Sequence, residues 1–171
     1  MLDFEHMKYI FIFSGIVLFT LLSYLFIWTP LQTVEVNDAL PQSVEESRDE
    51  ETTATSTPAT SMFVSEPVAL IDTPFHPASG YARIVESDGN TFLRYEDLDT
   101  INGPDLFVYL ATDDTANEFI NLGKLRATKG NANYDIPLGT DLSIYSHALI
   151  WCRAFGVLFN SADLSTVLNE E

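Results

Sequence analysis

The single cysteine of the chain, Cys152, is the residue with the widest chemical range in this sequence. One cysteine excludes an intramolecular disulfide, and therefore also a Cys-x-x-Cys redox pair. A buried free cysteine usually packs as a small apolar side chain, whereas a reactive cysteine needs a lowered pKa and some exposure to solvent. A disulfide between two copies of the chain is a third alternative. The surroundings of Cys152 must decide among these three.

A metal centre or a single-electron step at Cys152 would need a second ligand or a base nearby. Downstream of the apolar N-terminal block the sequence offers two histidines, His76 and His147. In a regular strand His147 and Cys152 have opposite parity and point to opposite faces, so they should not meet unless a bulge intervenes. His76 precedes Pro77, where packing or a turn hydrogen bond competes with a role as ligand. We therefore take Cys152 and His76 as the candidate pair for binding a cofactor.

Four acids, Glu96, Asp97, Asp99 and Asp105, surround one predicted turn. Oxygen ligands at this density can hold Ca²⁺, but the EF-hand spacing is missing. We expect a solvated acidic loop in which Asp105 fixes its own turn through backbone hydrogen bonds, and we predict no metal site. The Gly-x-Ser-x-Gly, His-Glu-x-x-His and phosphate-binding glycine motifs are also missing, which argues against a hydrolase. Whether the chain is an enzyme stays open on these residues alone.

The charge of the chain restricts its partners. There are 25 acidic and 8 basic residues, which give a formal net charge of -17. Nucleic-acid binding needs clustered basic side chains that release counterions from the phosphates, and the densest group here is Lys124, Arg126 and Lys129. The composition therefore excludes a nucleic-acid partner and leaves an unknown extracytoplasmic protein or redox partner.

Residues 9–28 form an uncharged apolar run with Tyr9, Tyr24 and Trp28 near its ends. As a helix with a rise of about 1.5 Å per residue, this run spans a hydrocarbon core of roughly 30 Å. A cleaved signal peptide is the main alternative, but its apolar region is usually shorter and small residues follow it. Lys8 precedes the run, so the positive-inside rule places residues 1–8 in the cytoplasm and the rest of the chain outside. We predict a single-pass membrane protein with an extracytoplasmic C-terminal domain.

Residues 29–65 are rich in acids, Ser, Thr and Pro. Such a composition cannot bury a core, and like charges extend the chain, so we expect a disordered linker. The folded domain should then occupy residues 66–168, because the remaining length suits one core.

Short apolar runs alternate with turn residues throughout this domain. Asp88-Gly89 is typical of a tight hairpin, and Gly103-Pro104 marks another change of direction. We expect strands at residues 81–86, 91–95, 106–110, 123–127, 133–136, 142–145 and 147–159, and a helix at 115–122. The prediction is an all-β antiparallel sandwich or barrel-like domain, with Cys152 in the interior of its last strand.

Several segments of the domain resemble a known family. The segments are residues 76–84 (HPASGYARI), 102–110 (NGPDLFVYL) and 150–155 (IWCRAF), together with the shorter runs 96–98, 122–125 and 134–137. In this order they resemble the DM-thirteen domain family from about Phe75 to Leu164. The combination of NGPDL-x-VYL with IWC-x-x-F is specific to it.

The resemblance implies a β-rich extracytoplasmic module of surface proteins that takes part in electron transfer. It also implies that Cys152 acts as a naked thiol or as a ligand to a prosthetic group such as haem, with His76 as a possible assisting residue. The alternative is a non-catalytic surface module for recognition or adhesion, in which Cys152 only packs in the core.

Overall fold

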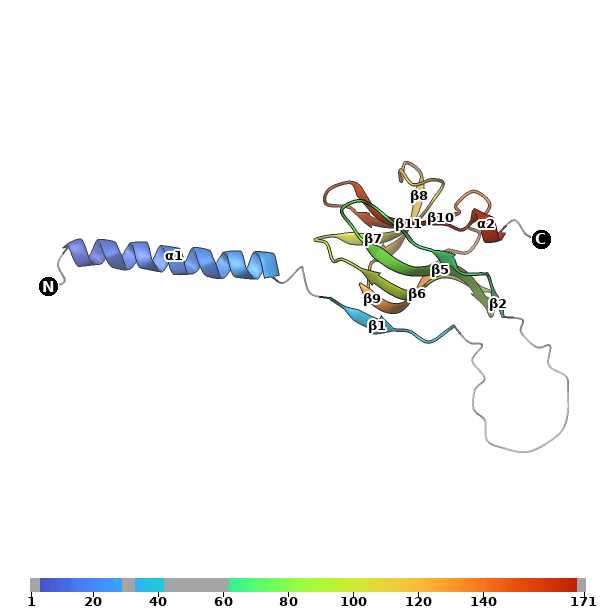
Figure 1. Cartoon of the computed structure of the whole chain (residues 1–171), viewed down its shortest axis with the longest axis horizontal. Helices are drawn as coiled ribbons and strands as arrows, with labels where there is room; N and C mark the ends of the chain where they lie inside the picture. Colours follow the sequence, from blue (N-terminus) through green and yellow to red (C-terminus); the bar gives the residue numbers. More distant parts are fainter. Residues whose placement is uncertain (1–3, 29–32, 42–61, 169–171) are drawn as a thin grey trace, which may run out of the picture.

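The computed structural model describes residues 4–28, 33–41 and 62–168 of the chain (Figure 1). In these residues a long helix, α1 (Phe4–Trp28), precedes a β domain that ends in a short helix, α2 (Ser165–Leu168). Along the described part of α1 both views show no packing on the sheets. No helix in the described ranges reaches the length and hydropathy required of a membrane span.

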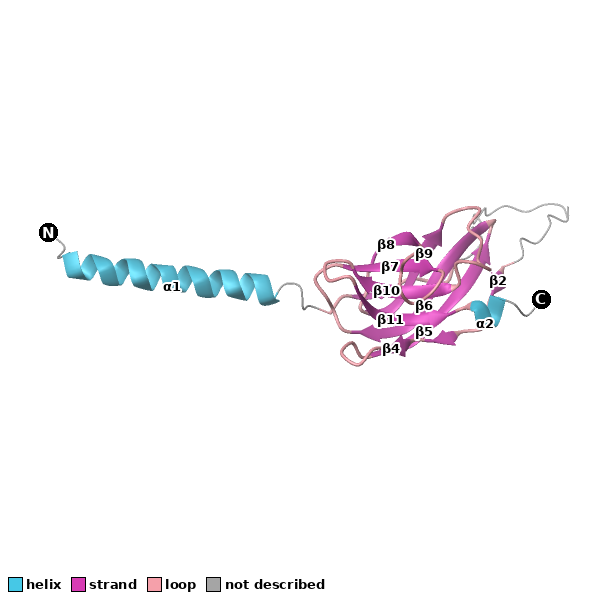
Figure 2. Cartoon of the chain, turned by 90° about the horizontal axis from the view of Figure 1, so that it is seen from above, coloured by secondary structure: helices cyan, strands magenta, loops and turns pink. Residues whose placement is uncertain are grey.

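The β domain consists of two sheets that face each other (Figure 2). Within the described residues the first sheet has the order β1-β9-β6-β5-β2, with β3 also paired to β5, and the second has the order β4-β11-β10-β7-β8. The strands are β1 (Glu35–Asn37), β2 (Phe63–Val64), β3 (Val68–Ala69), β4 (Ile71–Asp72), β5 (Ala78–Ser87), β6 (Asn90–Thr100), β7 (Leu106–Ala111), β8 (Phe119–Lys124), β9 (Lys129–Ile136), β10 (His147–Cys152) and β11 (Val157–Asp163). All pairings are antiparallel except that of β1 with β9. The expected mainly β fold is confirmed, and it is consistent with a sandwich.

The core lies between the two sheets and is built by alternation along the strands. Ile84 on β5 and Leu93 and Tyr95 on β6 are fully buried on one side, and Val108 on β7 and Ile150 on β10 are fully buried on the other. The β5–β6 hairpin turns at Asp88 and Gly89, whose φ angles of 53° and 74° suit a type I′ turn. The Asp-Gly pair thus sets the register that brings the apolar side chains to the core.

Four predicted elements differ from the structure. The strand expected at residues 123–127 is only the end of β8, because β8 stops at Lys124 and residues 125–127 lie outside any strand. Residues 115–122 are not a helix, because Ala116 adopts a φ of 53° and the chain enters β8 at Phe119. Residues 142–145 form a turn, in which the Asp141 carboxylate accepts hydrogen bonds from Ser143. Residues 147–159 are a hairpin of β10 and β11 and not one strand, because Gly156 at φ 63° reverses the chain and its N–H donates to the Cys152 carbonyl at 2.9 Å.

The expectation of a structureless linker over residues 29–65 is wrong for residues 33–41 and 62–65. Residues 35–37 form β1, and residues 63–64 form β2 on β5. Both stretches contain apolar side chains among the polar ones, and hydrogen bonds to partners far along the chain hold them on the sheet. The rest of the predicted linker lies outside the described residues.

Candidate functional site

Cys152 is the last residue of β10, and its side chain packs in the core between the two sheets. Its side chain is 0 % exposed. It is in register with Leu106 on β7 and with Val157 on β11, and it belongs to the main apolar core cluster. The predicted interior position of Cys152 is therefore confirmed, although its strand ends there and an exposed turn follows at residues 153–156.

The 102–110 and 150–155 segments meet beside Cys152. The Arg153 N–H donates to the Asp105 carbonyl at 3.0 Å, and Arg153 Nε donates to Asp105 Oδ2 at 2.9 Å. The guanidinium also lies 4.0 Å from the centre of the Phe107 ring, a distance at which cation and ring attract each other. Asp105 thus joins two strands, whereas we had expected it to fix its own turn. Asn102 does cap the turn locally, since its Oδ1 accepts the Gly103 N–H at 2.9 Å.

His76 is half-buried near one end of the same sheet. Its ring stacks on Phe159 with a centroid separation of 3.7 Å, and its Nδ1 lies 2.7 Å from Thr73 Oγ1. Its carbonyl accepts a hydrogen bond of 2.8 Å from the buried Asn160 side chain, whose Oδ1 accepts the Thr100 hydroxyl at 2.7 Å. These contacts hold the entrance of β5 against β11.

The structure does not join His76 directly to Cys152. The described contacts of His76 go to Thr73, Phe159 and Asn160, and among these Phe159 belongs to the core cluster that contains Cys152. His147 also points away from Cys152, as its parity predicts, because Ile150 and Cys152 face the core while the side chains of the opposite parity pack in a separate outer cluster. His147 Nε2 lies 3.9 Å from Asp163.

The comparison with known families decides the identity of this domain. The family model described as Electron transfer DM13 matches residues 70–164, which is more than half of the chain. The chain belongs to the DM13 family. No curated protein and no solved structure matches it.

The matched range includes His76, Asp105 and Cys152, whereas α1 and β1 lie outside it. In the DM13 domain the acids that had suggested a cation loop bind basic side chains instead. Glu96 lies 2.8 Å from both Arg83 and Arg94, and Asp99 lies 3.5 Å from Lys129. Among the residues that the structure describes, no group of three or more His, Cys, Asp or Glu side chains could hold a metal ion.

The surroundings of Cys152 do not fit a haem group. A haem needs open space beside its axial ligand, and the Cys152 side chain is enclosed by the packed core. Two surface hollows, of about 720 Å³ and 540 Å³, open elsewhere on the described part of the chain, and neither is lined by Cys152 or His76. His76 Nδ1 is also already within hydrogen-bond distance of Thr73.

Sequence reasoning missed the aromatic outer face of the second sheet. Tyr109 stacks on Phe119 with centroids 4.0 Å apart, and Trp151 lies 6.5 Å from Tyr109. Phe107 and Leu149 complete this outer cluster. The signal was present, since β7 and β10 are apolar at successive positions, which is typical of strands buried on both faces.

Proposed function

We propose that this protein is a single-pass membrane protein whose DM13 domain takes part in electron transfer on the extracytoplasmic side, through the sulfur of Cys152. Two observations support this proposal. The family model matches residues 70–164, and the 102–110 and 150–155 segments of that range meet beside Cys152. The enclosed core favours a thiol over a prosthetic-group ligand. A thiol fits this closed space and a haem does not.

The apolar helix supports the membrane part of the proposal. Residues 9–28 carry no charge, and the apolar side chains of α1 between Ile12 and Leu22 are exposed. A helix whose apolar side chains are exposed all round needs an apolar environment, which a bilayer provides. Lys8 and the acids that follow residue 34 favour a cytoplasmic N-terminus.

A fully buried thiol can exchange electrons by direct contact only when its cover opens. We take the turn at residues 153–156, which directly follows Cys152, as the part that opens; the contacts of Arg153 with Asp105 and Phe107 hold its first residue. Opening of this turn would expose the end of β10 without unfolding the sheets. The Asp105–Arg153 pair therefore controls access to Cys152 in this proposal.

The test is the rate at which a maleimide modifies Cys152 in the full chain in detergent. Replacement D105A removes the acceptor of Arg153, so we expect the native-state rate to rise about tenfold or more. The matched control is D114A, which removes an exposed acid from the turn before β8. Circular dichroism and the melting temperature confirm that each variant is folded.

Three further results distinguish a role of Cys152 as a free thiol from a role as a cofactor ligand. A colourless, metal-free protein that reacts faster after D105A and loses its cellular redox phenotype in C152A supports the thiol proposal. A chromophore bound in stoichiometric amount would instead show that Cys152 acts as a ligand. A thiol inert in both variants, with the phenotype intact in C152A, removes the redox proposal.

The aromatic face favours a second candidate function, recognition of a surface partner. Phe119 is 41 % exposed and stacks on Tyr109. Exposed rings of this kind are typical of contact surfaces. If recognition is the function, F119S abolishes attachment to the partner while C152A retains it; the reverse result favours electron transfer.

A further inference from the structure

The segment at residues 33–41 lies on the free edge of β9 as an added strand. β1 pairs with β9 in parallel register, Glu35 opposite Lys129 and Asn37 opposite Asn131. Before β1, the Val34 N–H donates to Thr128 Oγ1 at 3.0 Å, and after it the Asp38 N–H donates to the Asn131 carbonyl at 2.9 Å. The strands that hold this segment belong to the matched DM13 range, and the segment itself does not.

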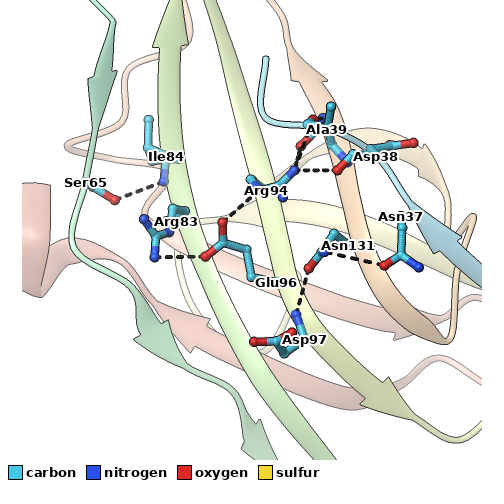
Figure 3. A network of polar contacts seen from close by, with 11 residues as sticks. Asn37, Asp38, Ala39, Ser65, Arg83, Ile84, Arg94, Glu96, Asp97 and Asn131 are labelled. Atoms are coloured by element: carbon cyan, nitrogen blue, oxygen red, sulfur yellow. Dashed lines mark hydrogen bonds and ion pairs between the residues drawn. The ribbon is translucent and has the colours of Figure 1, made fainter. Parts of the chain in front are cut away.

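Arg94 recognises the backbone of the segment (Figure 3). It stands on the outer face of β6 and is only 5 % exposed. Its Nη1 donates to the carbonyl oxygens of Asp38 and Ala39 at 3.2 Å each, while its Nε donates to Glu96 at 2.8 Å. Its Nη1 also donates to Asn133 Oδ1 at 2.8 Å, so Arg94 connects the segment to both Glu96 and Asn133.

Asn133 and Arg126 complete the contacts with the segment. The Asp38 carboxylate accepts the Asn133 N–H at 3.0 Å and a hydrogen bond from Arg126 Nη2. Asn133 Nδ2 donates to the Ala39 carbonyl at 2.8 Å. Charge-assisted hydrogen bonds of this kind are stronger than neutral ones, so an aspartate at this position is distinguished from other residues. The backbone hydrogen bond from Asn133 is the main reason that the pKa of Asp38 is lowered, and Arg126 adds to it.

The edge is also shaped to accept the segment. Val36 packs against the main core cluster, so the added strand extends the core as well as the sheet. Gly130 has a φ of 97°, and a Cβ at this position would lie 2.2 Å from the Val36 carbonyl oxygen. A side chain at residue 130 would therefore obstruct the segment.

We propose that the β9 edge of the DM13 domain, with Arg94, Arg126 and Asn133, is a binding site for an extended peptide with an aspartate at the position of Asp38. In this chain its occupant is the segment at residues 33–41. Such strand addition combines backbone pairing for affinity with side-chain contacts for specificity. Consequently the segment that follows α1 is clipped to the domain independently of residues 42–61, and a chain cut between residues 50 and 56 stays together.

The test uses the full chain in detergent, with a specific protease sequence inserted between residues 50 and 56 and a tag at each end. After cleavage we expect the two pieces to co-purify. D38A removes the carboxylate that Arg126 and Asn133 bind, so the C-terminal piece should dissociate about tenfold faster or more. The matched control is E35A, because the Glu35 carboxylate accepts a hydrogen bond from Asn37 within the same segment. E35A should behave as the wild type.

A second measurement uses only the wild-type chain, so it remains valid if D38A does not fold. A synthetic peptide of residues 32–41, added to the cleaved wild-type chain, should displace the N-terminal piece, and the same peptide carrying D38A should need about tenfold more for the same displacement. Immediate separation of the wild-type pieces, or equal potency of the two peptides, overturns the proposal. Because both assays report association in detergent, failure of membrane insertion or of Cys152 chemistry does not affect them.

Discussion

The Tyr95 hydroxyl is buried in the core and has no hydrogen-bond partner among the residues that the structure describes. Burial raises the pKa of Tyr95 far above its ordinary value, with a further increase from Tyr134, so the group stays neutral. The neighbouring Tyr134 ring meets Tyr95 edge to face at 6.0 Å, but its hydroxyl accepts the Arg126 N–H at 2.9 Å. The two tyrosines therefore share a packing environment and differ in hydrogen bonding.

We predict that Y95F leaves the free energy of unfolding unchanged or raises it by about 1 kcal/mol, because it removes an unpaired polar group from the core. Y134F should lower the same free energy by about 1 kcal/mol, because it leaves the Arg126 N–H without its acceptor. Urea unfolding of both variants measures the difference. A larger loss in Y95F than in Y134F would contradict the prediction.

Single residues were predictable where the reason is local. The interior position of Cys152 follows from the apolar residues around it, and the separation of His147 from Cys152 follows from strand parity. The Asp105–Arg153 pair was not predictable, because 48 positions separate the two residues and only the pairing of β7 with β10 brings them together. The role of His76 stays a prediction, and its stacking on Phe159 was not predictable because it depends on the β10–β11 hairpin, which we had read as one strand.

At the scale of elements, β1 can pair with β9 only if Gly130 has no side chain. We predict that G130A releases β1, so the amides of residues 35–37 lose most of their protection in hydrogen exchange. G139A is the matched control, because Gly139 also has a positive φ, 82°, but a Cβ there would meet nothing within 4 Å. The two variants share a similar backbone penalty, and they differ in the collision with Val36. Equal protection of β1 in both variants would show that this collision is not decisive.

The sequence predicts well the strands that a clear turn motif separates from the preceding strand. Asp88-Gly89 separates β5 from β6, and Gly103-Pro104 precedes β7. The β10–β11 hairpin was missed because its turn at residues 153–156 contains Ala154 and Phe155, so the apolar run seems uninterrupted and Gly156 is the main sign of the reversal. β8 was read as a helix, although its exposure alternates with period two along Phe119 to Leu122.

For the whole molecule, composition predicts the β class but not the limits of the fold. The segment at residues 33–41 is short and adjoins an acidic Ser/Thr-rich stretch, and its partners lie more than 50 positions away on β6 and more than 90 positions away on β9. No local pattern encodes that pairing. The net charge of -17 has a similar limit, because it does not show that Glu96 and Asp38 are paired with arginines.

Acid should weaken the whole domain through carboxylates that are hydrogen-bonded in the folded state. The pKa of Asp38 is lowered below 3.8, mainly by the hydrogen bond from the Asn133 backbone, and the pKa of Asp163 is lowered mainly by the Ser165 hydroxyl. Both groups therefore bind protons more weakly in the folded chain than in the unfolded one. Their contribution to stability is complete above about pH 4 and is lost as the pH falls through their folded pKa values.

We predict that the urea midpoint of the full chain changes little between pH 7 and pH 5 and falls steeply below pH 4. D38N removes one of the titrating groups, so its midpoint should be lower than that of the wild type at pH 6 and should then fall less between pH 4 and pH 3. D88N, in the exposed β5–β6 turn, is the control and should retain the wild-type slope. If D38N retains it as well, the Asp38 carboxylate does not stabilise the domain, and the clip at the β9 edge depends on backbone pairing and on Arg94 alone.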